Sequence, residues 1–197
     1  MDLETAIVTR RSERRLAEPA PTDEEFADLL RMAAMAPDHG LLRPWRWILV
    51  RDDARRVLGE TFAAAAAERH ESVAAKALRA PLLATLVFQP DRCHRVPEWE
   101  QMAATCAMSH ALMLLLHARG YGSIWRTGAF TGLPGVRGLL DLRFDEQLLG
   151  WLYVGTPLLP PARPTRSPQD MSSRVSALTV TRTSLSLESL LPDPARG

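Results

Sequence analysis

Lysine, cysteine and net charge are all scarce in this chain, and each shortage narrows its possible functions. Lysine occurs once, at Lys76, and basic and acidic residues nearly cancel to a formal net charge of +1. No global field therefore directs the chain to nucleic acid or to a membrane surface. We expect neither as a partner.

The chain has only two cysteines, Cys93 and Cys106, and they form no CxxC pair. Cys93 and His94 have no other possible ligands at a zinc-like spacing, so we expect no metal site. Cys106 lies in an apolar segment and is expected to be buried. The acidic N-terminus lacks the apolar stretch of a signal peptide. Together with the low cysteine count, this favours a cytoplasmic protein.

The length of 197 residues predicts one domain, or one domain with a tail, and a hydrophobic content of 46% suffices for a sizeable core. After Leu158 the sequence becomes rich in proline and then in serine, threonine and arginine. We therefore predict a folded domain over residues 1–160. Residues 161–197 are predicted to form an extended or partly disordered arm.

The longest apolar segment runs from Glu98 to Arg119 and is apolar on nearly all sides. Such a helix is typical of a buried core, and its apolar part is too short to cross a bilayer. Gly120 is placed to cap its end. Residues 120–128 then combine glycine, tryptophan, arginine and threonine in a turn and strand. A core does not require that mixture, whereas contact with a ligand does.

The remaining periodicity predicts alternating helices and strands. Helices are expected at residues 2–9, 22–36, 54–69, 73–79 and 133–142, and strands at 45–51, 81–89 and 146–155. Thr22 and Glu25 form a capping-box pattern at the start of the second helix. Asp52 and Asp53 are N-cap candidates for the third.

Two polar segments allow a structural and a functional interpretation. Arg10, Arg11 and Ser12 follow the first helix, where they could simply place cations at its C-terminus or could clamp a phosphate. Asp38 and His39 lie in a loop, where either could cap a turn or contact a ligand. The local sequence leaves both alternatives open.

Familiar catalytic motifs are missing from the sequence. It has no nucleophile elbow, no recognisable pair of catalytic carboxylates, no Walker loop and no glycine-rich dinucleotide fingerprint after a strand. If the chain is an enzyme, we expect a bound cofactor to supply the chemistry while the protein supplies binding and electrostatics.

Four sequence blocks, in matching order and spacing, resemble the nitroreductase family of FMN flavoproteins, and more closely its small YdjA-type branch. The blocks are Arg10–Ser12, Ala36–His39 with Pro44–Trp45, Val96–Gln101, and Gly122–Gly128 with Leu152–Pro157. The resemblance covers residues 1–160. It implies an α+β three-layer fold with a central, mostly antiparallel sheet flanked by helices. It also implies a domain-swapped type of homodimer with FMN at the interface.

The resemblance also implies site residues. It assigns FMN binding to Arg10, Arg11, Ser12, Met35, His39, Trp125, Arg126, Thr127 and Arg163. It assigns a nicotinamide or substrate pocket to Leu41, Arg43, Trp99, Arg119 and Gly120. No side chain is implied as catalytic, because the flavin carries the chemistry. Met35 stands where some relatives have a basic residue.

The implied activity is ping-pong hydride transfer through flavin N5, from NADPH or NADH to a small-molecule acceptor such as a nitroaromatic or a quinone. The sequence does not choose between the two donors. Two alternatives share the fold. One is a different redox activity, such as that of a dehydrogenase or a dehalogenase, and the other is a non-catalytic flavin-binding dimer.

Overall fold

The computed structural model describes residues 1–66, 69–158 and 169–179. The chain divides into two units, residues 1–165 and 166–197, and the first contains the fold described below. Its helices are α1 (Leu3–Thr9), α2 (Asp23–Ala33), α3 (Asp52–Ala64), α4 (His70–Ala74), α5 (Glu98–Ala118) and α6 (Pro134–Leu139), with 3-10 turns η1 (His39–Leu41), η2 (Ala75–Leu78) and η3 (Ala129–Gly132). Its strands are β1 (Leu16–Ala17), β2 (Trp45–Val50), β3 (Leu82–Phe88), β4 (Gly122–Arg126) and β5 (Gln147–Pro157).

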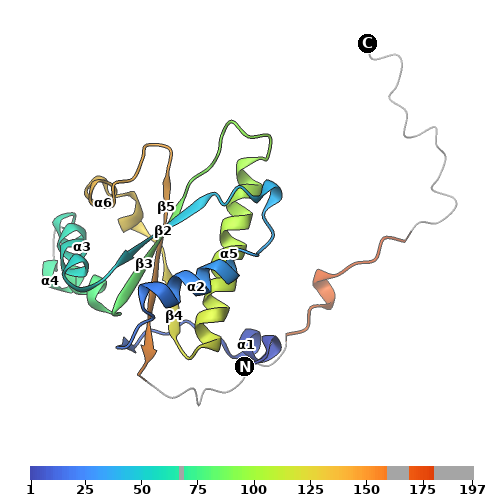
Figure 1. The fold of residues 1–197 in the computed structure, drawn as a ribbon, viewed down its shortest axis with the longest axis horizontal. Coiled ribbons are helices and arrows are strands. Elements are labelled where there is room, and N and C mark those ends of the chain that lie inside the picture. Colours follow the sequence, from blue (N-terminus) through green and yellow to red (C-terminus); the bar gives the residue numbers. More distant parts are fainter. Residues whose placement is uncertain (67–68, 159–168, 180–197) are drawn as a thin grey trace, which may run out of the picture. The chain divides into compact units, whose positions relative to one another are not determined.

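The strands form one antiparallel sheet around β5, the longest of them (Figure 1). β5 pairs with β3 along one edge and with β4 along the other, while β2 pairs with β3. The short strand β1 pairs with the last residues of β5. The central, mostly antiparallel sheet implied by the family resemblance is confirmed.

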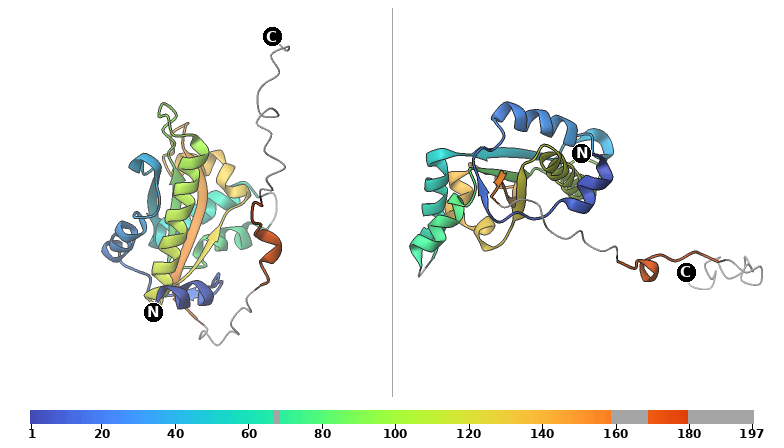
Figure 2. Two further views of the ribbon diagram at one scale, coloured as in Figure 1. Left: turned by 90° about the vertical axis from the view of Figure 1, so that its right-hand side faces the viewer. Right: turned by 90° about the horizontal axis from the view of Figure 1, so that it is seen from below.

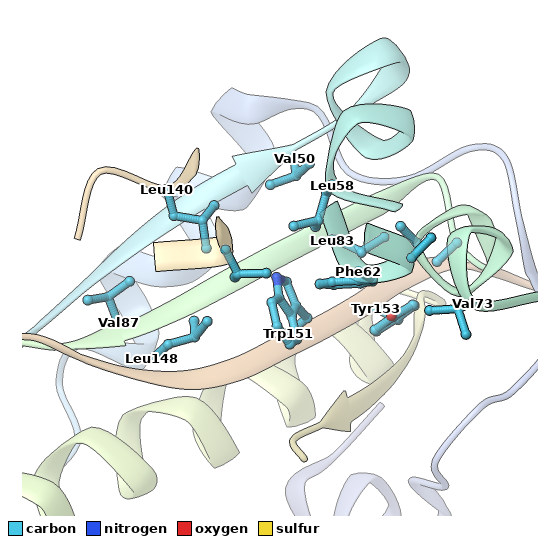
Figure 3. Packing of buried hydrophobic residues seen from close by; sticks show 14 of the residues in the cluster. Val50, Leu58, Phe62, Val73, Leu83, Val87, Leu140, Leu148, Trp151 and Tyr153 are labelled. Carbon is cyan, nitrogen blue, oxygen red and sulfur yellow. The ribbon is translucent and has the colours of Figure 1, made fainter. Parts of the chain in front are cut away.

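Helices cover both faces of this sheet, as the two views in Figure 2 show. On one face α3, α4 and α6 enclose a core that includes Leu58, Phe62, Val73, Val136 and Trp151 (Figure 3). On the other face α2 and α5 enclose a core that includes Phe26, Leu29, Met108, Leu112 and Leu152. Because neighbouring residues of a strand point to opposite faces, β5 contributes to both cores. The predicted three-layer α+β architecture is confirmed.

Local capping explains most of the helix boundaries. The predicted capping box is present, since Thr22 Oγ1 accepts from the Glu25 amide and Glu25 accepts from the Thr22 amide. The assignment of Asp52 and Asp53 as N-cap residues is wrong. Arg51 occupies that position in extended conformation, and the two aspartates lie in the first turn, where their charges favour the helix dipole.

The prediction that α5 is buried on all sides is wrong for the single chain. The residues against the sheet are buried, among them Met108, Leu112 and Leu116. Trp99 on the opposite side is 70% exposed, and Cys106, expected to be buried, is also exposed. Composition alone shows that the helix is apolar, but it does not show whether the second face is covered by the same chain.

The second unit contains a described segment at residues 169–179, with one 3-10 turn, η4 (Ser172–Arg174). Most of the arm predicted over residues 161–197 lies outside the described residues.

Candidate functional site

The arginine-rich segment lies along the outer edge of β4. Ser12 forms a parallel bridge with Ser123, and the Glu13 amide donates to the Ser123 carbonyl at 3.0 Å. Within the described residues, no strand pairs with this edge beyond Ser123. The backbone of β4 from Ile124 onward is therefore open on that side.

Arg10 and Arg11 end α1 and bring positive charge close to the end of α5. Arg10 is the C-cap residue, and Arg11 Nη1 donates to the carbonyls of Val8 at 2.7 Å and Arg10 at 3.0 Å. This shows that Arg11 stabilises the helix end with one nitrogen. The capping interpretation is thus correct for Arg11, and it leaves the rest of the guanidinium group for a ligand.

The charges of these two arginines act on the pKa of His117. Its Nε2 lies 2.8 Å from Thr9 Oγ1, which joins α5 to α1. Burial lowers the pKa of His117, and the nearby charges of Arg10 and Arg11 lower it further, against an opposing effect of Glu13. The end of α1 therefore lies close enough to the end of α5 for its arginine charges to act on His117.

Trp125 and Arg126 lie on opposite faces of β4. The Trp125 indole N–H donates to the Leu149 carbonyl at 3.0 Å, and its ring packs against the α2–α5 core. The Arg126 guanidinium lies on the other face, 5.6 Å from the centre of the Tyr153 ring. Arg126 Nε is buried and has no hydrogen-bond acceptor among the described residues.

Two glycines shape the backbone at this end of β4. Gly150 has φ +111°, and a Cβ there would meet the Arg126 carbonyl oxygen, so only glycine lets β5 pass so close. Gly128 has φ +122°, and a Cβ built on it would have open space around it. The backbone of Thr127 and Gly128 is therefore accessible to a bound molecule.

The His39 loop forms a second group of predicted residues at the start of α5. His39 Nδ1 lies 2.8 Å from Glu100 Oε2, and the Arg43 amide donates to Asp38 Oδ2 at 2.7 Å. Leu41 and Arg43 both have positive φ values, of 52° and 46°. A conformation that is unfavourable for such side chains is held by local hydrogen bonds.

Met35 and Trp99 present their side chains to the surface near this loop. Met35 is 84% exposed, directly after α2, and Trp99 lies in the first turn of α5. Neither is held by the core of its own chain.

The two groups of predicted residues lie at opposite ends of α5. Glu100, which contacts His39, and His117, which lies beside Arg10, are 17 residues apart on one helix. At 1.5 Å per residue this separation is about 26 Å. The structure of one chain therefore does not bring His39 together with Arg10, Arg11 and Ser12.

Arg119 and Gly120 follow the end of α5, but Arg119 faces a different surface. It lines a groove of about 210 Å³ together with Glu25, Asp28 and Tyr121. Two carboxylates line this groove together with the arginine. Arg163, the last predicted FMN contact, lies outside the described residues.

The structure adds residues that sequence reasoning missed. A cavity of about 380 Å³ is lined by Lys76, Arg79 and Phe130 together with Arg126 and Thr127. Lys76 was noticed only as the single lysine of the sequence, and no local pattern linked it to β4. Glu100 was part of a matched sequence block, but its contact with His39 could not be read from the spacing.

Two properties of the described residues bear on the kind of site. Residues 1–66, 69–158 and 169–179 contain no group of three or more histidine, cysteine, aspartate or glutamate side chains that could hold a metal. In the same ranges, no helix is long and apolar enough to cross a membrane.

Comparison with solved structures defines the class of fold. A nitroreductase-like family protein from Bacillus cereus matches with a TM-score of 0.78 at 23% identity, covering 90% of this chain and 96% of that one. A protein from Desulfovibrio desulfuricans, crystallised with FMN, matches with a TM-score of 0.66 at 21% identity, covering 90% and 97%. At these identities the likeness shows the fold alone. The fold is nitroreductase-like.

Sequence comparison identifies the family. The model of the nitroreductase family matches residues 7–156. The protein of Escherichia coli K12 named "Putative NAD(P)H nitroreductase YdjA" is 39% identical over 166 residues, which cover 81% of this chain and 90% of the relative. The chain belongs to the nitroreductase family, and the resemblance to its YdjA-type branch is confirmed.

Proposed function

We propose that this protein is an FMN-dependent NAD(P)H oxidoreductase that reduces nitroaromatic or quinone-type acceptors by a ping-pong mechanism. One structural observation carries the proposal: the bridge between Ser12 and Ser123 sets the end of the Arg10–Ser12 segment beside β4, the strand that ends in Trp125 and Arg126 and is followed by Thr127. A segment suited to a phosphate and an accessible backbone thus meet at one sheet edge. Membership of the nitroreductase family and the FMN bound to the D. desulfuricans protein support the cofactor assignment.

The residues of this edge fit FMN. Arginine and hydroxyl groups suit a phosphate, and Arg10, Arg11 and Ser12 provide both kinds at one end. The open backbone around Thr127 and Gly128 suits the hydrogen-bonding edge of a flat ring system at the other end. The buried Nε of Arg126 is a donor that a ring oxygen would satisfy.

A homodimer is part of the proposal. The uncovered face of α5 carries Trp99, Ala103 and Cys106, and α1 beside it exposes Leu3 and Ile7. Large exposed apolar surfaces of this kind are typical of interfaces. If two α5 helices pair antiparallel across a two-fold axis, the start of one helix lies beside the end of the other. His39 of one copy then approaches Arg10–Ser12 of the other.

Bound FMN would supply hydride transfer between a nicotinamide and an acceptor. The protein supplies binding and charge. Arg10 and Arg11 offset the phosphate charge, and Arg126 places a positive charge at the ring end. The contact with Glu100 orients the His39 ring, because the carboxylate accepts from Nδ1 and leaves Nε2 directed elsewhere. Solvent provides the protons.

The net reaction balances without a further reactant. For a nitroaromatic acceptor, one hydride from NAD(P)H and one proton convert the nitro group to a nitroso group and water, leaving NAD(P)+. For a quinone, the same hydride and proton give the hydroquinone. The name of the YdjA relative supports NAD(P)H as the donor. The cytoplasmic location stays a prediction.

The test of this function is an absorbance spectrum of the purified full-length protein, recorded with added FMN and then with NADPH or NADH under anaerobic conditions. We expect a flavin spectrum that bleaches with a nicotinamide and returns when a nitroaromatic or a quinone is added. A flavin that stays oxidised with both donors would favour the carrier alternative. A protein that binds no FMN would contradict the proposal altogether.

The dimer is tested with a charge placed on the exposed face of α5. Ala103→Glu is expected to yield a monomer by light scattering at micromolar concentration and to lose FMN, since a buried unpaired carboxylate is costly at an interface. Ala54→Glu puts the same change on exposed α3 and is the matched control. A wild-type protein that is monomeric and retains FMN would refute the shared site.

A further inference from the structure

We propose that His117 is a positioning residue of the FMN site: it fixes the end of α1 through Thr9 and, by taking up a proton, strengthens the binding of the FMN phosphate as the pH falls. This inference rests on the proposed function for the assignment of the phosphate to Arg10–Ser12. His117 lies in the last turn of α5, and Thr9 is the last residue of α1. Neither belongs to a sequence block that carries the family resemblance.

The hydrogen bond between the two helices determines which nitrogen of His117 carries a hydrogen. Thr9 Oγ1 donates its one hydrogen to the Thr5 carbonyl oxygen at 2.5 Å, so towards His117 it can only accept. His117 Nε2, which lies 2.8 Å from Thr9 Oγ1, is therefore the donor. The neutral ring then has its hydrogen on Nε2 and a bare Nδ1. A second proton can be added at Nδ1 without breaking the contact between α1 and α5.

This contact holds the segment that is assigned to the phosphate. Thr9 is followed directly by Arg10, the C-cap residue of α1. The other end of the segment is held by the bridge between Ser12 and Ser123. Arg10–Ser12 is thus fixed at both ends, by α5 through Thr9 and by β4 through Ser12. A segment that is fixed before its ligand arrives loses less conformational entropy on binding.

The charged groups that act on His117 belong to the same segment and the residue after it. Burial of the ring lowers the pKa of His117 below its ordinary value of 6.5, and the charges of Arg10 and Arg11 lower it further, whereas Glu13 raises it. Without a bound anion, His117 is therefore mostly neutral at neutral pH.

A phosphate bound at Arg10–Ser12 would oppose this effect of the arginines. A phosphate monoester carries a charge of about −1.5 to −2 at neutral pH, and this charge offsets the two arginine charges that keep His117 neutral. The pKa of His117 would then rise, so that FMN binding would be accompanied by proton uptake at Nδ1 near and below pH 6.5. By linkage, the protein with protonated His117 binds the phosphate more tightly than the neutral form does. The affinity for FMN therefore rises as the pH falls through this range.

The test compares two replacements of His117 that differ in whether a hydrogen-bond donor remains. In His117→Gln the side-chain amide can still donate to Thr9 but cannot titrate, and in His117→Leu both properties are lost. The affinity of the full-length protein for FMN is measured by quenching of flavin fluorescence at about pH 8 and about pH 5.5, on either side of the ordinary histidine pKa. His70→Gln, which removes an exposed histidine of α4, is the matched control.

The two replacements should have different effects. We expect His117→Leu to weaken FMN binding about fivefold at both pH values, since a neutral hydrogen bond between α1 and α5 is lost. His117→Gln should bind FMN like the wild type at the higher pH and about threefold more weakly at the lower pH, because a partly screened charge interaction is lost. His70→Gln should match the wild type at both. Titration of the FMN phosphate itself is common to all variants, so the comparison between them removes it.

A second measurement needs no flavin. Nuclear magnetic resonance of the histidine rings gives the pKa of His117 with and without inorganic phosphate, and the signal is assigned by its absence from His117→Gln. We expect phosphate to raise the pKa of His117 in the wild type. In Arg11→Gln the pKa should be higher than in the wild type before phosphate is added, and phosphate should raise it less.

Three results would overturn the inference. They are a His117→Leu variant that binds FMN like the wild type, an affinity ratio between wild type and His117→Gln that is the same at both pH values, and a His117 pKa that neither FMN nor phosphate changes. A wild-type protein that binds no FMN, although phosphate raises the pKa of His117, would contradict the proposed function alone.

Discussion

Two clusters of basic side chains lie on different parts of the same sheet, and they differ in counter-charge. Among the described residues, a carboxylate accompanies the first cluster and none lines the second. Around Glu146, Arg46 and Arg143 surround a buried acid. In the second cluster, Lys76, Arg79 and Arg126 line a cavity together with aromatic rings. The first arrangement joins parts of the fold. The second arrangement has cations that a bound ligand could pair with, and we therefore propose a binding role for it.

The Glu146 carboxylate accepts hydrogen bonds from several neighbouring residues. Arg46 donates from Nε and Nη2 to the two carboxylate oxygens at 2.9 and 2.8 Å, and Gln89 donates from its side chain at 2.5 Å. The Arg143 amide adds a fourth hydrogen bond at 2.9 Å. The carboxylate thereby connects β2, the end of β3 and the turn before β5. The Arg46 hydrogen bond, more than any other interaction, lowers the pKa of Glu146 to about 2.

The largest expected effect follows from removing this acid. Glu146→Ala should cost about 3 kcal/mol of unfolding free energy, because it leaves Arg46 and Gln89 without their acceptor. Asp145→Ala is the control, since its contact with Arg143 is longer, at 3.5 Å, and more exposed. That variant should lose less than about 1 kcal/mol. Urea unfolding measures both, and equal losses would show that the cluster is not a structural unit.

The pH dependence of stability gives a second test. The folded-state pKa of Glu146 lies near 2, below its ordinary value of 4.5, so its stabilisation is fully present above pH 4.5. It should disappear as the pH falls from 4.5 towards 2. We therefore expect the stability difference between the wild type and Glu146→Gln to be constant from pH 6 to 8 and to shrink below 4.5. A difference that grows as the pH falls would contradict the assigned pKa shift.

The sequence predicted most elements of the fold from local signals. Strands β2, β3 and β5 follow from alternation and continuous apolar runs, and the α2 start follows from the capping box at Thr22. These signals are local, because they depend on neighbouring residues and not on the rest of the fold. The uncovered face of α5 was not predictable, because burial of a helix depends on what packs against it.

The site divides in the same way. The family resemblance predicts Arg10–Ser12 and Trp125–Thr127 as site residues. The structure bridges Ser12 to Ser123 of β4, the strand that also contains Trp125 and Arg126. The fold brings Lys76 and Arg79 to that strand across about 50 residues of sequence, and no motif records this. Proximity of that kind is set by the sheet and by the stacking of Phe62 on Phe130. The spacing of these residues along the sequence does not predict their proximity.

The smallest expected effect completes the comparison between the two basic clusters. Lys76→Gln and Arg79→Gln should change the unfolding free energy by no more than about 0.5 kcal/mol, because neither cation has an ion pair with a carboxylate in the part of the chain that the structure describes. At low ionic strength the change should be a small gain, since one repulsive charge is removed, and added salt should cancel it. Urea unfolding at two salt concentrations measures this. A loss near that of Glu146→Ala would mean that these cations stabilise the fold, and the distinction between a satisfied cluster and an available one would fail.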